Sequence, residues 1–366
     1  MVNSILKKLI ITTKISKKLI LMVSFLGILL VGCSNANVIS ELNSKKITDS
    51  SKDKLIVSTF SSENKGDILS LNVNDNTEKI LVKDKQVGIT GDLSSDESKV
   101  AYVDAVGETD PWQIYLHNFN DNETSKITNN KFGKSRAKIS DDNFIYFITG
   151  SKENVVKVGR VNIENSSYDI DIIDTTDSDR QADAFDVKNN KLIISTASRK
   201  LELQKWEEND KYVPITHTIF ETDLNGNNLK KIAEIQATSV QSISYNYDEK
   251  KIIICGYDIN NDSGYGIYEL SLDTGELKTI LTDNILANTE NSIVSGISHP
   301  PLATMSRDEN LIYFAGVPKN SEPASICGMS CYPTSIFTYN INTKEFKEIF
   351  TPKSASLIFD LNINYE

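Results

Sequence analysis

The stretch Ser306-Arg307-Asp308-Glu309-Asn310-Leu311-Ile312-Tyr313-Phe314 joins a polar turn to a run of apolar and aromatic residues. A turn Asp accepts hydrogen bonds from the backbone N–H groups that follow it, and β-branched and aromatic residues favour strands. The stretch therefore predicts a tight turn followed by a strand. The same pattern occurs six times, and the first strand residues of successive copies are 44 to 60 residues apart. The other five copies begin at Asp53, Ser95, Asp141, Asn189 and Asp248.

A second phrase follows the first one in each unit. It alternates apolar and polar residues and ends in Asn, Asp or Gly, as in residues 266–273 (GIYELSLD). A short final strand comes next, for example at residues 278–281. Repeated units of four short strands are typical of propeller blades. The sequence predicts an all-β fold, a six-bladed β-propeller with four-stranded blades, and it shows no convincing amphipathic helix.

The turns Ser94-Ser95-Asp96-Glu97 and Ser306-Arg307-Asp308-Glu309 resemble the Ser-Pro-Asp-Gly turn of a known repeat family. These are the WD40-like repeats of TolB and of the N-terminal propeller of dipeptidyl peptidase IV. The Ser and Asp are kept here, whereas the Pro and Gly are absent from every copy. The resemblance covers nearly the whole mature chain and implies a propeller. It implies little about function, and no residue match extends TolB's own partners to this chain.

The end of the chain predicts how the ring closes. The first unit has no inner strand of its own, because a polar segment runs directly into Asp53. Residues 356–363 (SLIFDLNI) remain after the sixth unit and resemble the inner strand at residues 239–245. We expect this C-terminal segment to be the innermost strand of the first blade, laid beside Leu55 to Phe60. A propeller needs such closure because each blade buries its faces against both neighbours.

The N-terminus has the features of a secretory signal. Five Lys precede the uncharged apolar run from Leu19 to Val31, 13 residues that are too few for a comfortable membrane span. The run ends in Leu30-Val31-Gly32-Cys33, which resembles the lipobox of bacterial lipoproteins. The resemblance implies cleavage before Cys33 and attachment of acyl chains such as palmitate, which together hold a protein stably on a membrane.

Three segments follow from this assignment. Residues 1–32 are the expected signal peptide, 33–53 the lipidated Cys and a flexible tether, and 54–366 the propeller. The expected location is the extracytoplasmic side of the cell membrane, with the lipid as anchor. Removing residues 1–32 takes away five Lys and no acidic residue, which lowers the formal charge from −11 to −16. This charge disfavours nucleic acid as a partner, and we expect a monomer.

The remaining cysteines differ in their setting. Cys255 lies in an apolar run and is expected to be buried. Cys327 and Cys331 lie in a loop, where they can form a small disulfide outside the cytoplasm. The CxxxC spacing alone does not predict a zinc site, because no second pair of Cys or His is near in the sequence.

Two insertions interrupt the repeats. One spans residues 199–216 and contains Trp206 and Tyr212, and the other spans 318–333 and contains the Cys pair. Both are expected between the second and third strands of a unit. Binding loops often occupy such places, and an elaborated loop without a partner is the equal alternative.

No residue set in the sequence predicts catalysis, a cofactor or a metal. The Gly-x-Ser-x-Gly motif of serine hydrolases is absent, and the Asp-rich stretches do not have the EF-hand spacing. The histidines His117, His217 and His299 are not expected to converge, because only His299 precedes an inner strand. The candidates for a binding site at the mouth of the central tunnel are Arg136, Arg180, Gln241 and His299.

The expected function is non-catalytic binding of a protein, a peptide or an envelope component. The alternative is a propeller enzyme, a lyase or a hydrolase that acts on an extracellular polymer or peptide. The tunnel mouth distinguishes them, since an enzyme should gather His, Arg and acids there at close range. A solute-binding lipoprotein is disfavoured, because those proteins are usually two-lobed and α/β.

Overall fold

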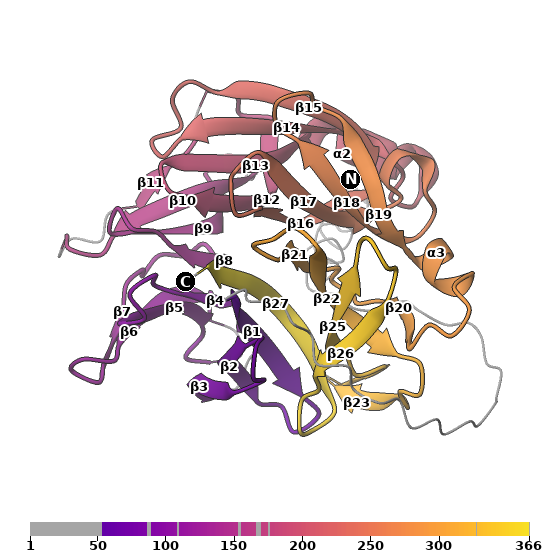
Figure 1. Cartoon of the computed structure of the whole chain (residues 1–366). Coiled ribbons are helices and arrows are strands. Elements are labelled where there is room, and N and C mark those ends of the chain that lie inside the picture. Colours follow the sequence, from indigo (N-terminus) through magenta and orange to yellow (C-terminus); the bar gives the residue numbers. More distant parts are fainter. Residues whose placement is uncertain are drawn as a thin grey trace, which may run out of the picture. The chain divides into compact units, whose positions relative to one another are not determined.

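The computed structural model describes residues 53–85, 89–107, 110–152, 155–165, 170–174, 176–326 and 328–365. These residues form six sheets of four or five strands that follow one another around a ring, and a separate two-stranded sheet (Figure 1). Cys33, Cys327 and the expected signal peptide lie outside the described residues. Within the described part, no helix has the length and apolar character that a membrane crossing needs.

Each sheet of the ring is one antiparallel blade, here given with its inner strand first. Blade 1 contains β27 (Ser356–Tyr365), β1 (Asp53–Ser61), β2 (Gly66–Asn72) and β3 (Glu78–Lys85). Blade 2 contains β4 (Gly91–Leu93), β5 (Lys99–Asp104), β6 (Gln113–Asn118) and β7 (Glu123–Lys126). Blade 3 contains β8 (Lys134–Ile139), β9 (Phe144–Gly150), β10 (Val156–Asn162) and β11 (Ile170–Ile172).

The second half of the ring follows the same order. Blade 4 contains β12 (Arg180–Lys188), β13 (Lys191–Ser198), β14 (Ile215–Asp223) and β15 (Lys230–Ala237). Blade 5 contains β16 (Ser239–Tyr245), β17 (Lys251–Tyr257), β18 (Tyr265–Ser271) and β19 (Leu277–Thr282). In blade 6, β20 (Val294–Ile297) and β21 (Ala303–Met305) share the inner position, followed by β22 (Leu311–Pro318), β25 (Ser335–Asn340) and β26 (Phe346–Phe350).

The core of the propeller lies between the blades. A separate cluster of buried apolar side chains fills each interface between neighbours, including the one between blades 6 and 1. There Leu55 and Val57 of β1 and Ile358 of β27 pack against Tyr313 and Ile336 of blade 6. The strands read as nearly continuous apolar runs because both faces of each blade are covered. Burial between blades is therefore the main stabilising contribution to the ring.

The C-terminal strand closes the first blade, as the sequence predicts. β27 pairs with β1 along nearly its whole length, from Ser356 opposite Ser61 to Tyr365 opposite Asp53. Figure 1 shows the yellow β27 beside the indigo β1. One blade thus joins the two ends of the described chain.

The turns between inner and second strands explain the altered repeat motif. In blade 2, Asp96 accepts hydrogen bonds from the backbone N–H of Ser98 (3.0 Å) and from the hydroxyl of Ser94 (2.6 Å). The residue after the Asp is left-handed, with φ of 57° at Glu97, 58° at Glu249 and 58° at Glu309. Gly adopts this conformation most easily, and here Glu takes its place.

The Glu side chains compensate by reaching the preceding blade. Glu97 pairs with Lys54, Glu249 with Lys191 (4.0 Å) and Glu309 with Lys251 (2.8 Å). In each pair the Lys lies at or near the start of the second strand of its blade. Glu adopts the left-handed backbone conformation less easily than Gly would, but its side chain adds an ion pair between neighbouring blades.

The propeller has two unlike faces. The turn face carries the short turns between inner and second strands, and Asp53 and Tyr365 also lie at this end of their strands. The loop face carries the connections between second and third strands and those between blades. Three additions lie on the loop face: α2 (Arg199–Asn209), α3 (Asp283–Ala287) and the hairpin of β23 (Ala324–Ile326) and β24 (Met329–Cys331).

The insertion after β13 contains the helix α2, although the sequence shows no convincing amphipathic helix there. The helix has no buried residue and no apolar stripe, which is why the periodicity did not reveal it. Its start is fixed by Ser198, whose side chain accepts the backbone N–H of Leu201 at 3.1 Å. Both insertions do fall between the second and third strands of their blades.

Candidate functional site

Side chains on the inner strands join each blade to the next around the ring axis. We call these links the polar belt. They run from Asn362 Nδ2 to the Gly91 carbonyl (2.9 Å), from Ile139 N to Asp92 Oδ2 (3.3 Å), from Lys138 Nζ to Asp186 Oδ1 (3.0 Å), from Tyr245 N to Asp186 Oδ2 (2.8 Å), between the hydroxyls of Ser244 and Thr304 (2.9 Å), and from Tyr365 Oη to the Met305 carbonyl (2.8 Å). All neighbouring pairs of inner strands are connected in this way.

A charged group forms the centre of the polar belt. Burial raises the pKa of Asp92 to about 7, with Asp186 and Asp360 adding to the rise and Lys138 opposing it. Burial by itself lowers the pKa of Lys138, but the carboxyl groups of Asp186, Asp92 and Asp360 outweigh it, so that the pKa rises. Lys138 is therefore the cation that holds these carboxylates together at the axis.

Bulges interrupt the inner strands of five blades. The register shifts beside Phe359, Arg136, Asp183, Gln241 and Ser295, so that each residue falls out of the regular pairing. A bulge redirects the side chain that it carries, and bulges are common beside functional sites. Two of the four candidates, Arg136 and Gln241, lie at such bulges.

Arg136 lies on the loop-face side of the polar belt, two residues before Lys138 in β8. Its backbone is left-handed (φ 56°), and its backbone N–H donates to Thr90 Oγ1 at 3.0 Å. The half-buried guanidinium has no hydrogen-bond acceptor among the described residues. Burial lowers the pKa of Arg136, while the nearby carboxyl groups of Asp360 and Asp183 oppose this shift. The side chain is thus available to an acidic ligand group.

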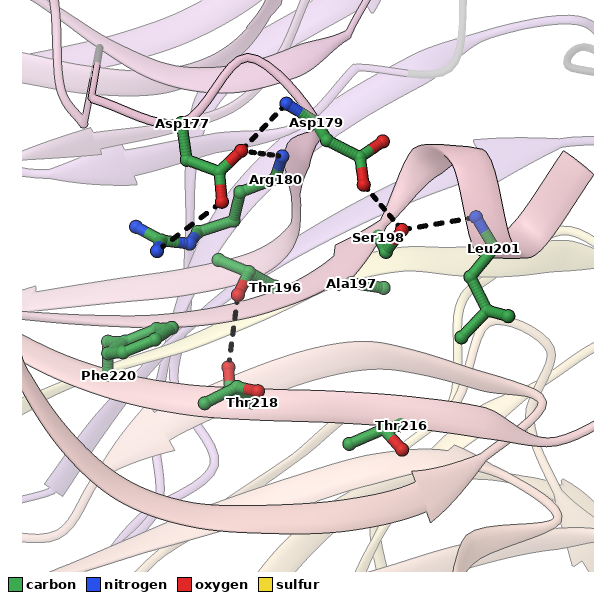
Figure 2. A pocket seen from close by; sticks show the side chains of 10 residues that line it. All are labelled: Asp177, Asp179, Arg180, Thr196, Ala197, Ser198, Leu201, Thr216, Thr218 and Phe220. Atoms are coloured by element: carbon green, nitrogen blue, oxygen red, sulfur yellow. Dashed lines mark hydrogen bonds and ion pairs between the residues drawn. The ribbon is translucent and has the colours of Figure 1, made fainter.

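Arg180 is turned away from the axis. Its guanidinium pairs with Asp174 (2.8 Å) and Asp177 (3.6 Å) and lies 4.7 Å from the ring centre of Phe220, on the third strand of blade 4. There it lines a pocket of about 290 Å³ (Figure 2). The other lining residues are Asp177, Asp179, Thr196, Ala197, Ser198, Leu201, Thr216, Thr218 and Phe220.

The polar groups of this pocket are largely engaged with one another. Asp177 Oδ1 accepts the backbone N–H groups of Asp179 (2.9 Å) and Arg180 (3.3 Å). Asp179 accepts the hydroxyl of Ser198 at 2.6 Å (Figure 2). It also accepts the backbone N–H of Lys200 at 2.8 Å, and the two bonds tie α2 to the linker before β12. These hydrogen bonds hold the α2 insertion in place and leave few polar groups of the pocket for a ligand.

Gln241 and His299 also have separate partners. Gln241 Nε2 donates to Ser239 Oγ at 3.1 Å. His299, between β20 and β21, shares a hydrogen bond of 2.7 Å with the Tyr265 hydroxyl. Arg136, Arg180, Gln241 and His299 are therefore not brought together in one place.

The three histidines occupy three different blades. His117 contacts Thr124 Oγ1 (2.9 Å), and His217 contacts Asp183 Oδ2 (2.8 Å) and the Ala237 carbonyl (3.1 Å). Within the described ranges, no three His, Cys, Asp or Glu side chains are placed to hold a metal ion. Cys255 is fully buried, and burial raises its thiol pKa to about 12.

The turn-face end of the axis is occupied by side chains from opposite blades. Lys188 ends the inner strand of blade 4, and its Nζ lies 4.3 Å from the ring centre of Tyr365, which ends the inner strand of blade 1. Tyr247 and Arg307, from the turns after β16 and β21, complete this group. Side chains from four blades therefore meet at this end of the axis.

Sequence reasoning did not identify the charged residues of the polar belt. Asp92, Lys138, Asp186 and Asp360 each lie on an inner strand next to apolar residues. The only signal in the sequence is a charged residue within each of several inner strands. The bulges shift these residues to different positions in the repeat, so their common level around the axis is seen only in the structure.

The comparisons agree on the fold. No protein-family model matches the chain, and no curated protein matches its sequence. The structure is similar to TolB from Acinetobacter baumannii, with a TM-score of 0.60, 12% identity, and coverage of 86% of this chain and 67% of that chain. It is also similar to a chain of the nidogen/laminin complex, with a TM-score of 0.55, 10% identity, and coverage of 85% and 98%.

A more distant likeness is to an oligogalacturonate lyase in complex with manganese, at a TM-score of 0.45 and 13% identity, covering 81% of this chain and 73% of that chain. It is too remote to support an argument about chemistry. Identities this low show the architecture alone. The chain therefore has a TolB-like fold, a six-bladed propeller closed by its C-terminal strand.

Proposed function

We propose that this chain is a lipoprotein, anchored through Cys33 outside the cytoplasmic membrane, and that its loop face binds a protein, peptide or envelope component without catalysis. The observation that carries the proposal is the asymmetry between the two faces. All three additions to the repeat, α2, α3 and the β23–β24 hairpin, lie on the loop face. Loops on a rigid scaffold are where binding residues concentrate.

The positions of the exposed apolar side chains also support the loop face as the binding face. Five large hydrophobic residues are exposed in the described part of the chain. Three of them lie on the loop face: Val106 between β5 and β6, Ile285 in α3 and Tyr332 after β24. Val106 is 78% exposed and Tyr332 49%. Apolar and aromatic side chains held out on separate loops suit a protein partner.

The direction of the chain is consistent with an anchor on the other side. β1 begins at Asp53 on the turn face, so a tether of residues 33–52 would join the propeller there. The loop face would then point away from the attachment point. One structural neighbour comes from a complex of two proteins, nidogen and laminin, which supports a protein-binding role for this fold.

The enzyme alternative receives less support from the axis. Its charged side chains form bonds between blades, and three of the four candidate residues, Arg180, Gln241 and His299, have separate partners. Arg136 is the one candidate on the axis without an acceptor in the described residues. It would pair with a carboxylate of a bound ligand.

Site-specific photocrosslinking on intact cells tests the proposal. A photoreactive amino acid replaces Val106, Ile285 or Tyr332 on the loop face, and Asp273 or Lys344 on the turn face as controls. We expect the loop-face positions to capture the same partner and the controls to capture none. Equal capture from both faces would contradict the assignment of the face. Chemical conversion of the captured ligand by the purified full chain would show that the enzyme alternative is correct.

A further inference from the structure

Four side chains meet where the axis reaches the turn face, and we call them the cation–tyrosine cluster: Lys188, Tyr247, Arg307 and Tyr365. The Tyr247 and Tyr365 rings are 5.3 Å apart and nearly edge to face. Lys188 Nζ lies 4.3 Å from the Tyr365 ring centre and 5.2 Å from that of Tyr247. Each residue comes from a different blade, so the cluster exists only in the closed ring.

Arg307 has an unusual environment for a guanidinium. Its Cζ lies 4.6 Å from the ring centre of Tyr247, and its backbone N–H donates to Asp53 Oδ2 at 3.2 Å. None of its guanidinium nitrogens has a hydrogen-bond acceptor in the described part of the chain, and Nε is completely buried. Because Nε is closed off from solvent, only the terminal nitrogens, which are not among the buried unpaired atoms, can reach an acceptor from outside the chain.

Lys188 adds a second cation that has one unused hydrogen-bond donor. Its ammonium donates to the carbonyls of Asn246 (2.8 Å) and Tyr247 (2.7 Å), which leaves one of its three N–H groups free. Burial, with a smaller contribution from Arg307, lowers the pKa of Lys188 to about 8 against the opposing effect of Asp186, Glu249 and Asp248. Two cations that disfavour each other's charge are stabilised when an anion lies between them.

The surroundings limit the size of such an anion. The neighbouring turns of the same face carry acidic pairs, Asp248 with Glu249 and Asp308 with Glu309. Together with the net charge of −11, these acidic groups disfavour an extended polyanion such as nucleic acid at this face. Tyr247 is 45% exposed and forms the accessible wall of the cluster.

We propose that the cation–tyrosine cluster is a binding site for one small oxyanion, a phosphate or carboxylate group. The terminal nitrogens of Arg307 would hold it as a fork, the free N–H of Lys188 would donate a further bond, and Tyr247 would form one wall. Arg binds planar and tetrahedral oxyanions through two parallel bonds, and Lys adds a point charge. The site lies opposite the loop face and does not depend on the function proposed above.

Thermal unfolding of the full chain in non-ionic detergent tests the site. The probes are inorganic phosphate, glycerophosphoglycerol and acetate, each compared with chloride at equal ionic strength. We expect a saturable rise in Tm with at least one probe, because a ligand that binds only the folded state raises its stability. The strongest probe identifies the source: free phosphate, a phospholipid headgroup or a carboxylate.

Variants separate binding from simple packing. Arg307→Gln should raise the half-saturating concentration at least about tenfold, as expected for the loss of charge-assisted bonds, and Lys188→Met should act in the same direction. Lys344→Gln is the matched control, because Lys344 also lies over a tyrosine on this face, 5.6 Å from the Tyr339 ring centre. Each variant is compared with its own Tm in chloride. The proposal is overturned if no probe exceeds chloride, or if Arg307→Gln keeps the wild-type half-saturation.

Discussion

Leu55 in β1 lies directly opposite Ile363 in β27, so that the first described strand and the last one form a single sheet. Leu55 belongs to the apolar cluster between blades 6 and 1, and the partly buried Ile363 packs against this cluster. The ring is therefore closed twice at one place, by strand pairing within blade 1 and by packing against blade 6. Closure depends on a segment of about ten residues at the end of the chain.

Deleting residues 356–366 from the full chain should destabilise it far more than trimming an ordinary terminus does. The deletion removes Leu357, Ile358 and Leu361 from the core and exposes the inner edge of β1. We expect Tm to fall by about 10 °C or more. Thermal unfolding measures this, and an unchanged Tm would mean that the ring closes by other contacts.

Asp92→Asn should stabilise the protein at alkaline pH. The pKa of Asp92 is about 7 in the folded chain against a usual 3.8, so the ionised form is disfavoured by folding. The stability that the protonated Asp92 carboxyl contributes is fully present below pH 4 and is lost as the pH rises through 7. Relative to wild type, the variant should therefore gain about 1 to 3 kcal/mol at pH 8 and little at pH 4. Urea unfolding at both pH values measures the difference.

Asp96 in the same blade is the matched control, with the opposite sign. Hydrogen bonds from Ser94 and Ser98 lower its pKa to about 2. Its contribution is present above pH 4 and is lost as the pH falls towards 2, so Asp96→Asn should destabilise the protein at pH 7 and not at pH 2. If both variants change stability in the same direction at pH 8, the burial of Asp92 does not govern its effect.

Ser198→Ala should loosen α2 without unfolding the propeller. The helix has no buried residue, so its start depends on the hydroxyl that accepts Leu201 N–H and donates to Asp179. Losing an N-cap costs about 1 kcal/mol. Limited proteolysis should cut residues 199–209 faster while Tm changes little. Ser198→Thr keeps the cap and should behave like wild type, and equal cutting of all three forms would contradict the role of the cap.

Cys33→Ala tests the expected lipid anchor. The variant should keep its signal peptide, because lipoprotein signal peptidase acts before a lipidated Cys, and it should not incorporate a fatty-acid probe. Metabolic labelling followed by gel analysis measures both effects. Label that persists in the Ala variant would show that another residue carries the lipid. Cys255→Ala is the control, since that thiol is fully buried.

Cys327 and Cys331 should form a disulfide in the exported protein. Cys331 ends β24, and its thiol lies 3.7 Å from the Met329 carbonyl. Oxidation would close a loop of five residues within the insertion of blade 6. Intact-mass analysis after alkylation without reductant should show no alkyl group on this pair. Two added groups at these positions would mean that both thiols are free.

The order of the blades and the closure of the ring could be predicted from the sequence because their signals are local. The turn at Asp96 and the strand that follows are coded within about ten residues, and the same phrase recurs. The strand at residues 356–363 remained after six units, and the inner position of the first blade was the one position without a strand. Such features survive the loss of the motif's Pro and Gly, since Asp still accepts the backbone N–H groups of the turn.

The direction of side chains near the axis could not be predicted in the same way. Arg136 and Arg180 are both basic residues in the first half of an inner strand, yet Arg136 lies near the axis and Arg180 lies over Phe220. The difference comes from the bulge and the left-handed backbone at Arg136. One extra residue in a strand reverses the side of the sheet to which the following side chains point. Nothing in the local amino-acid composition indicates where such a bulge occurs.

The double pairing of β1 also determines how the domain would carry a mechanical load. A force applied on the N-terminal side of Asp53 pulls along the direction of β1, which pairs with β27 on one side and β2 on the other. Both ladders are then loaded in shear, and their hydrogen bonds share the force instead of breaking one after another. Tension between an anchor at this end and a ligand on the opposite face would thus act along the strongest direction of the first blade.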